Sequence, residues 1–203
     1  MKHQIFVIHG GDTFDTYDMY LNFLKNWEID FGRYLADKRD WKENVAAGLG
    51  SDFEVIRPDM PNKRNAQYSE WKIWFEKFIP HFEPEVVLVG HSLGGAFLAK
   101  YLSENKFPRT IKAVFLIAAV FDADMEGYPL ASFTLPEKLD LQADKIYLYH
   151  SKDDPVVPFA DLAKFQAKLH GAVARVFTDR GHFNQEELPE LVEDIKNCFN
   201  ESS

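Results

Sequence analysis

Three residues in this chain have the chemical types of a nucleophile, an acid and a base. Ser92 comes first along the chain, Asp154 follows it and His182 comes last. A serine hydroxyl is a poor nucleophile at neutral pH, so it needs a base to take its proton and an acid to orient that base. The residue types and their order therefore predict a Ser-His-Asp triad that attacks a carbonyl group.

Ser92 lies in a short pattern that would present its hydroxyl at an exposed point. Gly-His-Ser-Leu-Gly-Gly at residues 90–95 stands between the apolar run Val86–Val89 and the helix-forming stretch Ala96–Leu102. A strand, a sharp turn and a helix in this order form a nucleophile elbow, whose glycines let two backbones pass closely. Gly-x-Ser-x-Gly also arises by chance, but the flanking strand and helix patterns favour the catalytic interpretation.

Asp154 and His182 each lie just after an apolar run. Asp154 belongs to Ser-Lys-Asp-Asp-Pro at residues 151–155, and His182 to Asp-Arg-Gly-His-Phe at residues 179–183. Ligands of open α/β sheets bind outside the carboxyl ends of the strands, so we expect both loops to reach the elbow. Gly181 gives its loop the freedom to carry the histidine ring inward, although an ordinary surface histidine is the alternative. Three other histidines are more typical of structural or exposed positions: His3, His81 and His170.

An acyl-transfer site also needs two backbone donors for the oxyanion. One comes from the residue after the nucleophile, which is Leu93. The other comes from a loop after an earlier strand, and His-Gly-Gly-Asp at residues 9–12 directly follows the first apolar run. We therefore expect the amides of Leu93 and Gly11 to form the oxyanion hole, the alternative being a glycine pair that only makes a turn.

The spacing of apolar runs and helical stretches predicts one α/β domain over residues 1–203. The runs are short and mostly uninterrupted, as in strands that are buried on both faces of a parallel sheet. They are Gln4–Ile8, Phe53–Arg57, Val86–Val89, Ala113–Ala118, Lys145–Tyr149 and Ala174–Phe177. Helical segments alternate with them, so we expect a three-layer α/β/α hydrolase fold with a mostly parallel, about six-stranded sheet.

Two connections are longer than usual and could act as lids over the site: residues 12–50 and 119–144. The first contains helical patterns at Tyr17–Trp27, Phe31–Leu35 and Asp40–Leu49. Surface decoration is the alternative for both segments. A further stripe of four aromatic residues in the segment Tyr68–Phe82 is typical of core packing: Trp71, Trp74, Phe75 and Phe78.

Composition and charge narrow the function classes. The 203 residues carry a formal net charge of −9, which opposes binding to nucleic acid or to an anionic membrane. The single cysteine, Cys198, cannot form an intrachain disulfide and lies on an apolar helical stripe, so we expect it to face the core. The first residues resemble a strand rather than a signal peptide, and no apolar run could span a membrane, so a cytoplasmic protein is expected.

Four motifs taken together resemble the small serine hydrolases related to retinoblastoma-binding protein nine. They are a strand followed by His-Gly, the Gly-His-Ser-x-Gly elbow, Ser-x-Asp-Asp-Pro-x-x-Pro and Gly-His-Phe. The resemblance implies a compact α/β hydrolase whose triad falls on Ser92, Asp154 and His182. The chain differs from that family in its long segment 12–50 and lacks a Leu-x-Cys-x-Glu motif, so retinoblastoma binding is not implied.

The sequence thus predicts a metal-independent serine hydrolase that acts on a small-molecule ester, with thioesters or amides as related substrates. The chain has no Cys-x-x-Cys, His-Glu-x-x-His or phosphate-loop pattern, so we expect neither a metal nor another cofactor. A hydrolase-fold protein that binds a partner with little turnover is the alternative, and a carbon–carbon hydrolase or lyase could use the same triad. The sequence leaves the oligomeric state open.

Overall fold

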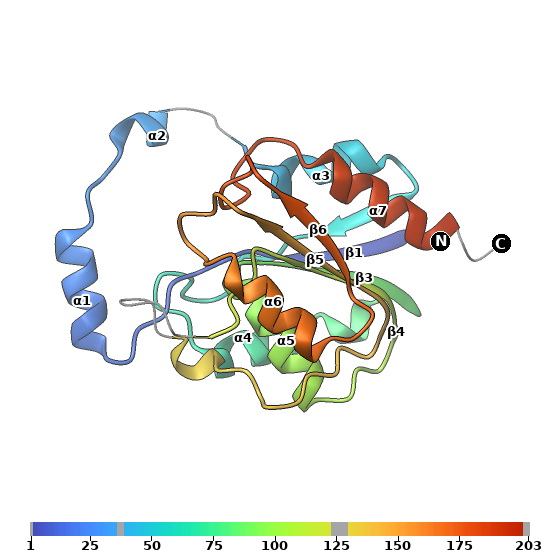
Figure 1. The fold of residues 1–203 in the computed structure, drawn as a ribbon, viewed down its shortest axis with the longest axis horizontal. Coiled ribbons are helices and arrows are strands. Elements are labelled where there is room, and N and C mark those ends of the chain that lie inside the picture. The colour runs from blue at the N-terminus through green and yellow to red at the C-terminus, as the bar shows by residue number, and fades with distance from the viewer. Residues whose placement is uncertain (1, 36–38, 123–129, 201–203) are drawn as a thin grey trace.

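The computed structural model describes residues 2–35, 39–122 and 130–200, and its centre is one sheet of six parallel strands (Figure 1). The strands lie in the order β2-β1-β3-β4-β5-β6. Their bounds are β1 His3–Ile8, β2 Phe53–Ile56, β3 Glu85–His91, β4 Thr110–Ile117, β5 Ala143–Ser151 and β6 Val173–Phe177. All six predicted strands are confirmed, and every neighbouring pair is parallel.

The strand order determines where a ligand site can form. The chain begins in β1, moves outward to β2, and then crosses back to β3 before continuing outward to β6. Direction therefore reverses between β1 and β3, which is the kind of switch point where open α/β sheets bind ligands beyond the carboxyl ends of their strands. The residues after β1 and β3 include Gly10, Gly11 and Ser92, so the predicted oxyanion loop and nucleophile meet at this point.

Helices cover both faces of the sheet and give the predicted three layers (Figure 1). One face carries α4 Tyr68–Glu76, α5 Leu93–Glu104 and α6 Ala160–Lys168, and the other carries α3 Trp41–Leu49 and α7 Pro189–Asn200. The strand residues between the layers are fully buried, as Val87 and Leu88 show on opposite faces of β3. Burial on both faces explains why the strands have uninterrupted apolar sequences.

The aromatic stripe after residue 68 is only partly buried. Trp71 and Phe75 are fully enclosed in the core, as predicted, but the Trp74 side chain is 39% exposed. The stretch Tyr68–Phe82 is not one helix, because α4 ends at Glu76 and a single 3₁₀ turn, Ile79–His81, follows it. Proline at the second position of that turn lacks the amide hydrogen that a longer α-helix would need.

The long segment 12–50 contains two structurally different parts. Its last helix, α3, buries Trp41, Val45 and Leu49 against the sheet, so it belongs to the outer helix layer. Its first helix, α1 Tyr17–Asn26, buries no residue and stands apart from the sheet together with the short α2 Phe31–Leu35 (Figure 1). Only residues 12–40 are therefore available for the predicted lid, within which residues 36–38 lie outside the described part.

The second long segment, 119–144, follows the body of the molecule where it is described. Four of its apolar side chains are buried in the same core as α5: Leu130, Phe133, Leu139 and Leu141. Residues 123–129, which the lid prediction also includes, lie outside the described residues. Cys198 is buried on α7, as predicted, and its thiol donates to the Asp194 carbonyl at 3.1 Å.

Candidate active site

Ser92 occupies the sharp turn between β3 and α5 with backbone angles φ 55° and ψ −122°. A non-glycine residue rarely adopts a positive φ, and such strain is typical of nucleophile elbows. The surrounding structure holds it there, since the Ser92 amide donates to the Ile117 carbonyl at 2.8 Å. A Cβ at Gly90 would lie 2.5 Å from the Gly94 carbonyl oxygen, and one at Gly94 would lie 2.5 Å from that of Ile8. Both glycines of the motif are therefore required by close backbone contacts.

Asp154 lies in the turn after β5, and its side chain is fully buried. Oδ1 accepts hydrogen bonds from the amides of Val156 at 2.8 Å and Val157 at 3.0 Å. The turn is fixed from the other side by His150, whose Nε2 lies 3.2 Å from the Val157 carbonyl oxygen. These contacts fix the carboxylate in one orientation, with Oδ2 directed at His182.

His182 lies in the loop after β6, with its side chain 10% exposed. Its Nδ1 is 2.9 Å from Oδ2 and 3.1 Å from Oδ1 of Asp154. Because a carboxylate can only accept a hydrogen bond, Nδ1 carries the hydrogen and Nε2 is left as the basic nitrogen. Gly181 and Phe183 on either side have φ values of 50° and 53°, so the histidine stands at the tip of a tightly turned loop.

The adjacent carboxylates of Asp153 and Asp154 make different contacts. Asp153 is exposed, and its Oδ1 accepts hydrogen bonds from the Ser151 hydroxyl and, at 3.0 Å, from the Gly181 amide. The Ser151 hydroxyl and then the Gly181 amide hold the pKa of Asp153 below its usual value. Asp153 thus shapes the loop that carries His182, whereas Asp154 contacts the histidine ring itself.

The elbow lies beside the Asp154–His182 pair. Among the hydrogen bonds of the described residues, none joins the Ser92 hydroxyl to His182. The two are connected through His91, whose ring centroid lies 4.8 Å from that of His182. Catalytic hydrogen bonds are often long without substrate and tighten when it binds, so the arrangement is compatible with the predicted triad.

The glycine loop and Leu93, which carry the two predicted oxyanion donors, pack against each other at the elbow. A Cβ at Gly10 would lie 3.4 Å from the Ser92 hydroxyl oxygen, and one at Gly11 would lie 3.5 Å from Cδ2 of Leu93. Gly11 also packs against the Lys63 carbonyl oxygen, which a Cβ would approach to 2.7 Å. Leu93 is the first residue of α5, so its amide belongs to the positive end of that helix.

His9 holds the predicted oxyanion loop, residues 9–12, in place. Its Nε2 accepts a hydrogen bond from the Met60 amide at 2.8 Å, so Nδ1 carries the hydrogen and donates to the Gly10 carbonyl at 2.6 Å. Burial lowers the pKa of His9, so the neutral ring that this pattern requires is favoured. Sequence reasoning used His9 only as part of a glycine motif and missed this role.

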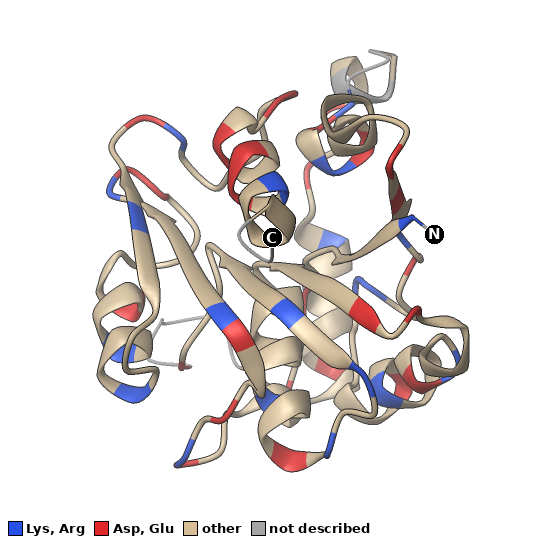
Figure 2. Ribbon diagram, turned by 90° about the vertical axis from the view of Figure 1, so that its right-hand side faces the viewer, with Lys and Arg blue, Asp and Glu red and all other residues tan. Residues whose placement is uncertain are grey.

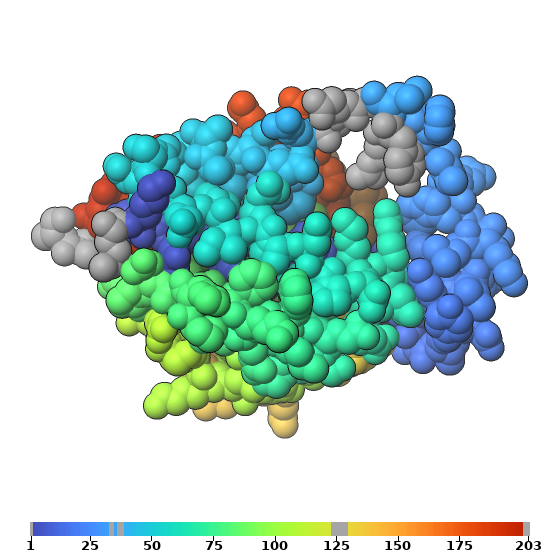
Figure 3. Space-filling model, turned by 180° about the vertical axis from the view of Figure 1, so that it is seen from behind, coloured from blue at the N-terminus to red at the C-terminus, as the bar shows by residue number. Residues whose placement is uncertain are grey.

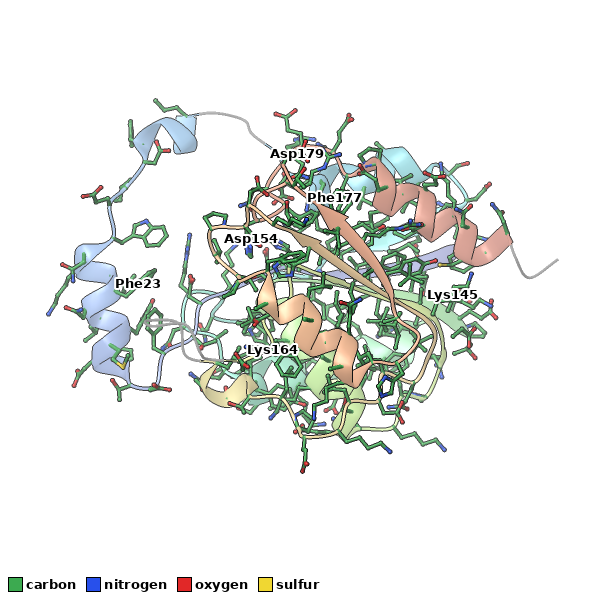
Figure 4. All side chains as sticks on the ribbon, in the orientation of Figure 1. Phe23, Lys145, Asp154, Lys164, Phe177 and Asp179 are labelled. Carbon is green, nitrogen blue, oxygen red and sulfur yellow. The ribbon has the colours of Figure 1, made fainter. Side chains whose placement is uncertain are left out.

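Helix α1 presents aromatic side chains near the same end of the sheet. Phe23 contacts Phe14 and Trp27, with ring centroids 5.0 and 4.9 Å apart. Figure 4 places Phe23 on the side of α1 that is turned toward the rest of the molecule, and Asp154 at the sheet edge that faces this helix.

Arg64 links α1 to the predicted oxyanion loop, because it lies 4.9 Å from the Trp27 ring and pairs with Asp12 at 3.2 Å. Figure 3 shows the blue α1 region at one end of the molecule, beside the turquoise segment that follows β2.

Across residues 2–35, 39–122 and 130–200, no group of three or more His, Cys, Asp or Glu side chains is arranged to hold a metal ion. In the same ranges, no helix has the length and apolar character needed to cross a membrane.

Comparisons with known proteins identify the family and agree with the fold. A family model described as "Serine hydrolase" matches residues 32–199. Serine hydrolase RBBP9 of Rattus norvegicus is 26% identical over 171 residues, which cover 78% of this chain and 86% of that protein. The predicted resemblance is thereby confirmed.

Solved structures with the same fold include two bacterial proteins. The ydeN gene product of B. subtilis superposes with a TM-score of 0.69 at 17% identity, covering 98% of this chain and 100% of that chain. The esterase domain of a Rhodothermus marinus protein superposes with a TM-score of 0.65 at 17% identity, covering 96% of this chain and 85% of that chain. Together with the family match over most of the sequence, the elbow and the sheet topology lead to one conclusion: this chain belongs to the serine hydrolase family.

Proposed function

We propose that the protein is a metal-independent serine hydrolase that cleaves small carboxyl esters through an acyl-enzyme on Ser92. Thioesters and amides are related possible substrates. The observation that carries the proposal is the buried Asp154 carboxylate 2.9 Å from Nδ1 of His182, next to a serine in a strained elbow. A base oriented by an acid beside a sharply turned serine is the arrangement that activates a hydroxyl.

In the first half of the reaction, the Ser92 hydroxyl oxygen attacks the ester carbonyl carbon as Nε2 of His182 takes its proton. Asp154 keeps Nδ1 protonated and stabilises the imidazolium that forms. The carbonyl oxygen becomes an oxyanion, for which the Leu93 and Gly11 amides are the proposed donors. The tetrahedral intermediate then expels the alcohol, which receives the proton from His182, and the acyl group remains on Ser92.

In the second half, water replaces the alcohol. His182 accepts a proton from the water as its oxygen attacks the acyl carbon, and the same two amides stabilise the second oxyanion. Collapse of this intermediate returns the proton to Ser92 and releases the carboxylic acid. No step draws on a group outside the chain and water, so the proposal includes no cofactor.

The proposed substrate is a small molecule that is neutral or cationic. A net charge of −9 disfavours phosphate-rich partners, and Figure 2 shows basic and acidic residues interspersed over one side of the molecule. The aromatic side chains of α1 offer apolar surface near the sheet edge at which Ser92 lies, which suits an acyl chain or an aromatic group.

A fluorophosphonate probe followed by a panel of esters tests the proposal. Wild-type protein should be labelled on Ser92 and should hydrolyse at least one short-chain ester, whereas Ser92→Ala should lose both properties. Ser51, an exposed serine in the turn before β2, supplies the control, since Ser51→Ala should behave as wild type. Continued labelling of Ser92→Ala on another serine would refute the assignment, and labelling of Ser92 without turnover of any ester, thioester or amide would favour a binding role.

A further inference from the structure

The loop that carries His182 is bound at two successive backbone carbonyls by ring N–H groups from elsewhere in the molecule. Nε2 of His91, the residue before the nucleophile, donates to the His182 carbonyl at 2.8 Å. Nε1 of Trp41, the first residue of α3, donates to the Phe183 carbonyl at 2.8 Å. Carbonyl oxygens only accept hydrogen bonds, so the nitrogen of each ring must carry the hydrogen.

The start of α3 binds the same loop at two more points. The Trp41 amide donates to the Gln185 carbonyl at 2.9 Å, and Nδ2 of Asn44 donates to the Glu186 carbonyl at 2.9 Å. The Phe183 side chain is fully buried and packs on Phe177 with centroids 5.5 Å apart. The backbone from residue 182 to residue 186 is therefore attached to α3 and to the end of β3.

His91 is suited to a permanent rather than a titrating role. It is 4% exposed and stands edge-on to the Trp41 ring, with centroids 6.1 Å apart. Burial, followed by the charges of Lys42 and His182, lowers its pKa well below the ordinary value. A neutral His91 adds no positive charge beside the imidazolium that forms on His182 during the reaction.

We propose that His91 and Trp41 are positioning residues, which fix the backbone of His182 so that its Nε2 meets the Ser92 hydroxyl. This inference rests on the proposed catalytic roles of Ser92 and His182. His91 is joined to Ser92 by one peptide bond, so its hydrogen bond ties the base loop directly to the backbone of the nucleophile. Asp154 holds only one nitrogen of the ring, and a ring held at one edge can still shift if its backbone moves. A shift of about 1 Å in a reacting group can cost about 100-fold in rate.

His91→Gln and His91→Asn, two substitutions of similar polarity, distinguish loss of the hydrogen bond to the His182 carbonyl from the general effect of replacing His91. The amide nitrogen of Gln lies about as far from the backbone as Nε2 of His, whereas the amide nitrogen of Asn lies at the nearer distance of Nδ1. His91→Gln should therefore keep the bond to the His182 carbonyl, and His91→Asn should lose it. His170→Asn is the matched control, because His170 is exposed after α6 and remote from the loop.

The assay measures kcat and KM with the best ester, together with the rate of fluorophosphonate labelling. We expect His91→Asn to lower kcat by about 10- to 100-fold while KM stays within about twofold, because His91 is buried and acts through its bond to the His182 backbone. His91→Gln should recover most of this loss. The low-field proton NMR signal of His182 Nδ1–H should be retained in His91→Gln and broadened in His91→Asn, which a purely structural role would not predict.

Trp41 supplies a second test. Trp41→Phe keeps a large aromatic ring in the core but removes the donor to the Phe183 carbonyl, and we expect kcat to fall by about tenfold. Trp74→Phe, a change of the same kind at a half-exposed position on α4, should leave kcat unchanged. Thermal unfolding of each variant shows whether it is folded when it is assayed.

The results separate this inference from the proposed function. If Ser92→Ala abolishes labelling and turnover but His91→Asn and His91→Gln have equal kcat, the positioning role is wrong and the hydrolase stands. Equal losses in Trp41→Phe and Trp74→Phe would likewise overturn the role of Trp41. If Ser92→Ala remains active, the proposed function itself fails, whatever the His91 variants do.

Discussion

Replacing Asp154 with Asn changes a single group at the point where the proposed acid meets the proposed base, His182. Oδ1 of Asp154 accepts hydrogen bonds from the amides of Val156 and Val157, so the oxygen of the new Asn side chain must remain there. Its NH₂ group then takes the position of Oδ2, which lies 2.9 Å from Nδ1 of His182. The N–H of Nδ1 and the new amide N–H repel each other, and Oδ1, which lies 3.1 Å from Nδ1, already accepts two backbone hydrogen bonds, so the imidazole tautomer with its hydrogen on Nε2 is favoured. The variant presents a hydrogen to Ser92 where the wild type presents a lone pair.

The size of the loss follows from that tautomer. The corresponding change in serine proteases lowers kcat about 10⁴-fold, and the contacts of Asp154 lead us to expect a similar loss here. A factor of 10⁴ corresponds to about 5 kcal/mol on the activation free energy. Ester hydrolysis at neutral pH measures kcat and KM, and the fluorophosphonate labelling rate reports the same base without a deacylation step. KM should change little, because the substituted atom is buried behind the histidine.

The neighbouring carboxylate is the control. Asp153 is exposed and uses Oδ1 to accept from the Ser151 hydroxyl and the Gly181 amide, and an Asn at this position keeps an oxygen for both. Asp153→Asn should therefore change kcat/KM by no more than about twofold, as is usual for exposed substitutions. A larger loss in Asp153→Asn than in Asp154→Asn would show that the acid has been assigned to the wrong residue.

Three further outcomes are expected. Phe23→Ala on α1 should lower kcat/KM for long acyl chains more than for acetate, by about 0.8 kcal/mol for each CH₂ that is no longer covered. Leu24→Ala on the same helix is the control, and an unchanged acyl-length profile for Phe23→Ala would argue against a lid. The free energy of unfolding should fall as the pH drops below the ordinary histidine value of 6.5, because burial lowers the pKa of His9, His91 and His150. Below that pH the unfolded chain binds protons that the folded chain does not. Each histidine then lowers the free energy of unfolding by up to about 1.4 kcal/mol per pH unit, and denaturant unfolding at several pH values measures this slope. EDTA should leave ester turnover unchanged, and a loss that a divalent ion restores would contradict the metal-free mechanism.

Local sequence was sufficient for the sheet and for the elbow. Strands such as β3 are buried on both faces, and that burial requires the uninterrupted apolar run that the sequence shows. Gly90 and Gly94 occur where any side chain would clash with a backbone oxygen, so the motif needs glycine at both positions for steric reasons. Asp154 and His182 follow strands β5 and β6, and parallel strands bring both loops to one edge.

The remaining features depend on tertiary contacts, which local sequence patterns do not predict. Trp74 has the helical spacing of a core residue, but the core around Trp71 and Phe75 leaves it half exposed. Trp41 belongs to a segment predicted as a lid, and its hydrogen bond to the Phe183 carbonyl depends on packing between distant elements. His91 was visible in the elbow motif, but its acceptor could not be inferred without the path of the base loop.

The attachment of the base loop to α3 also affects how the protein reaches its active state during folding. The side-chain bonds from Trp41 and Asn44 to that loop each join residues that are 142 positions apart in sequence. Contacts of such long range require closure of a large chain loop, and they form late because the entropy of closure must be offset first. During synthesis α3 emerges before β4, β5 and β6 have been made. The donor groups of Trp41 and Asn44 therefore have no acceptor until the loop after β6 has been synthesised. We therefore expect native-like secondary structure to appear before any of the proposed hydrolase activity, with His182 positioned only in the final step of folding.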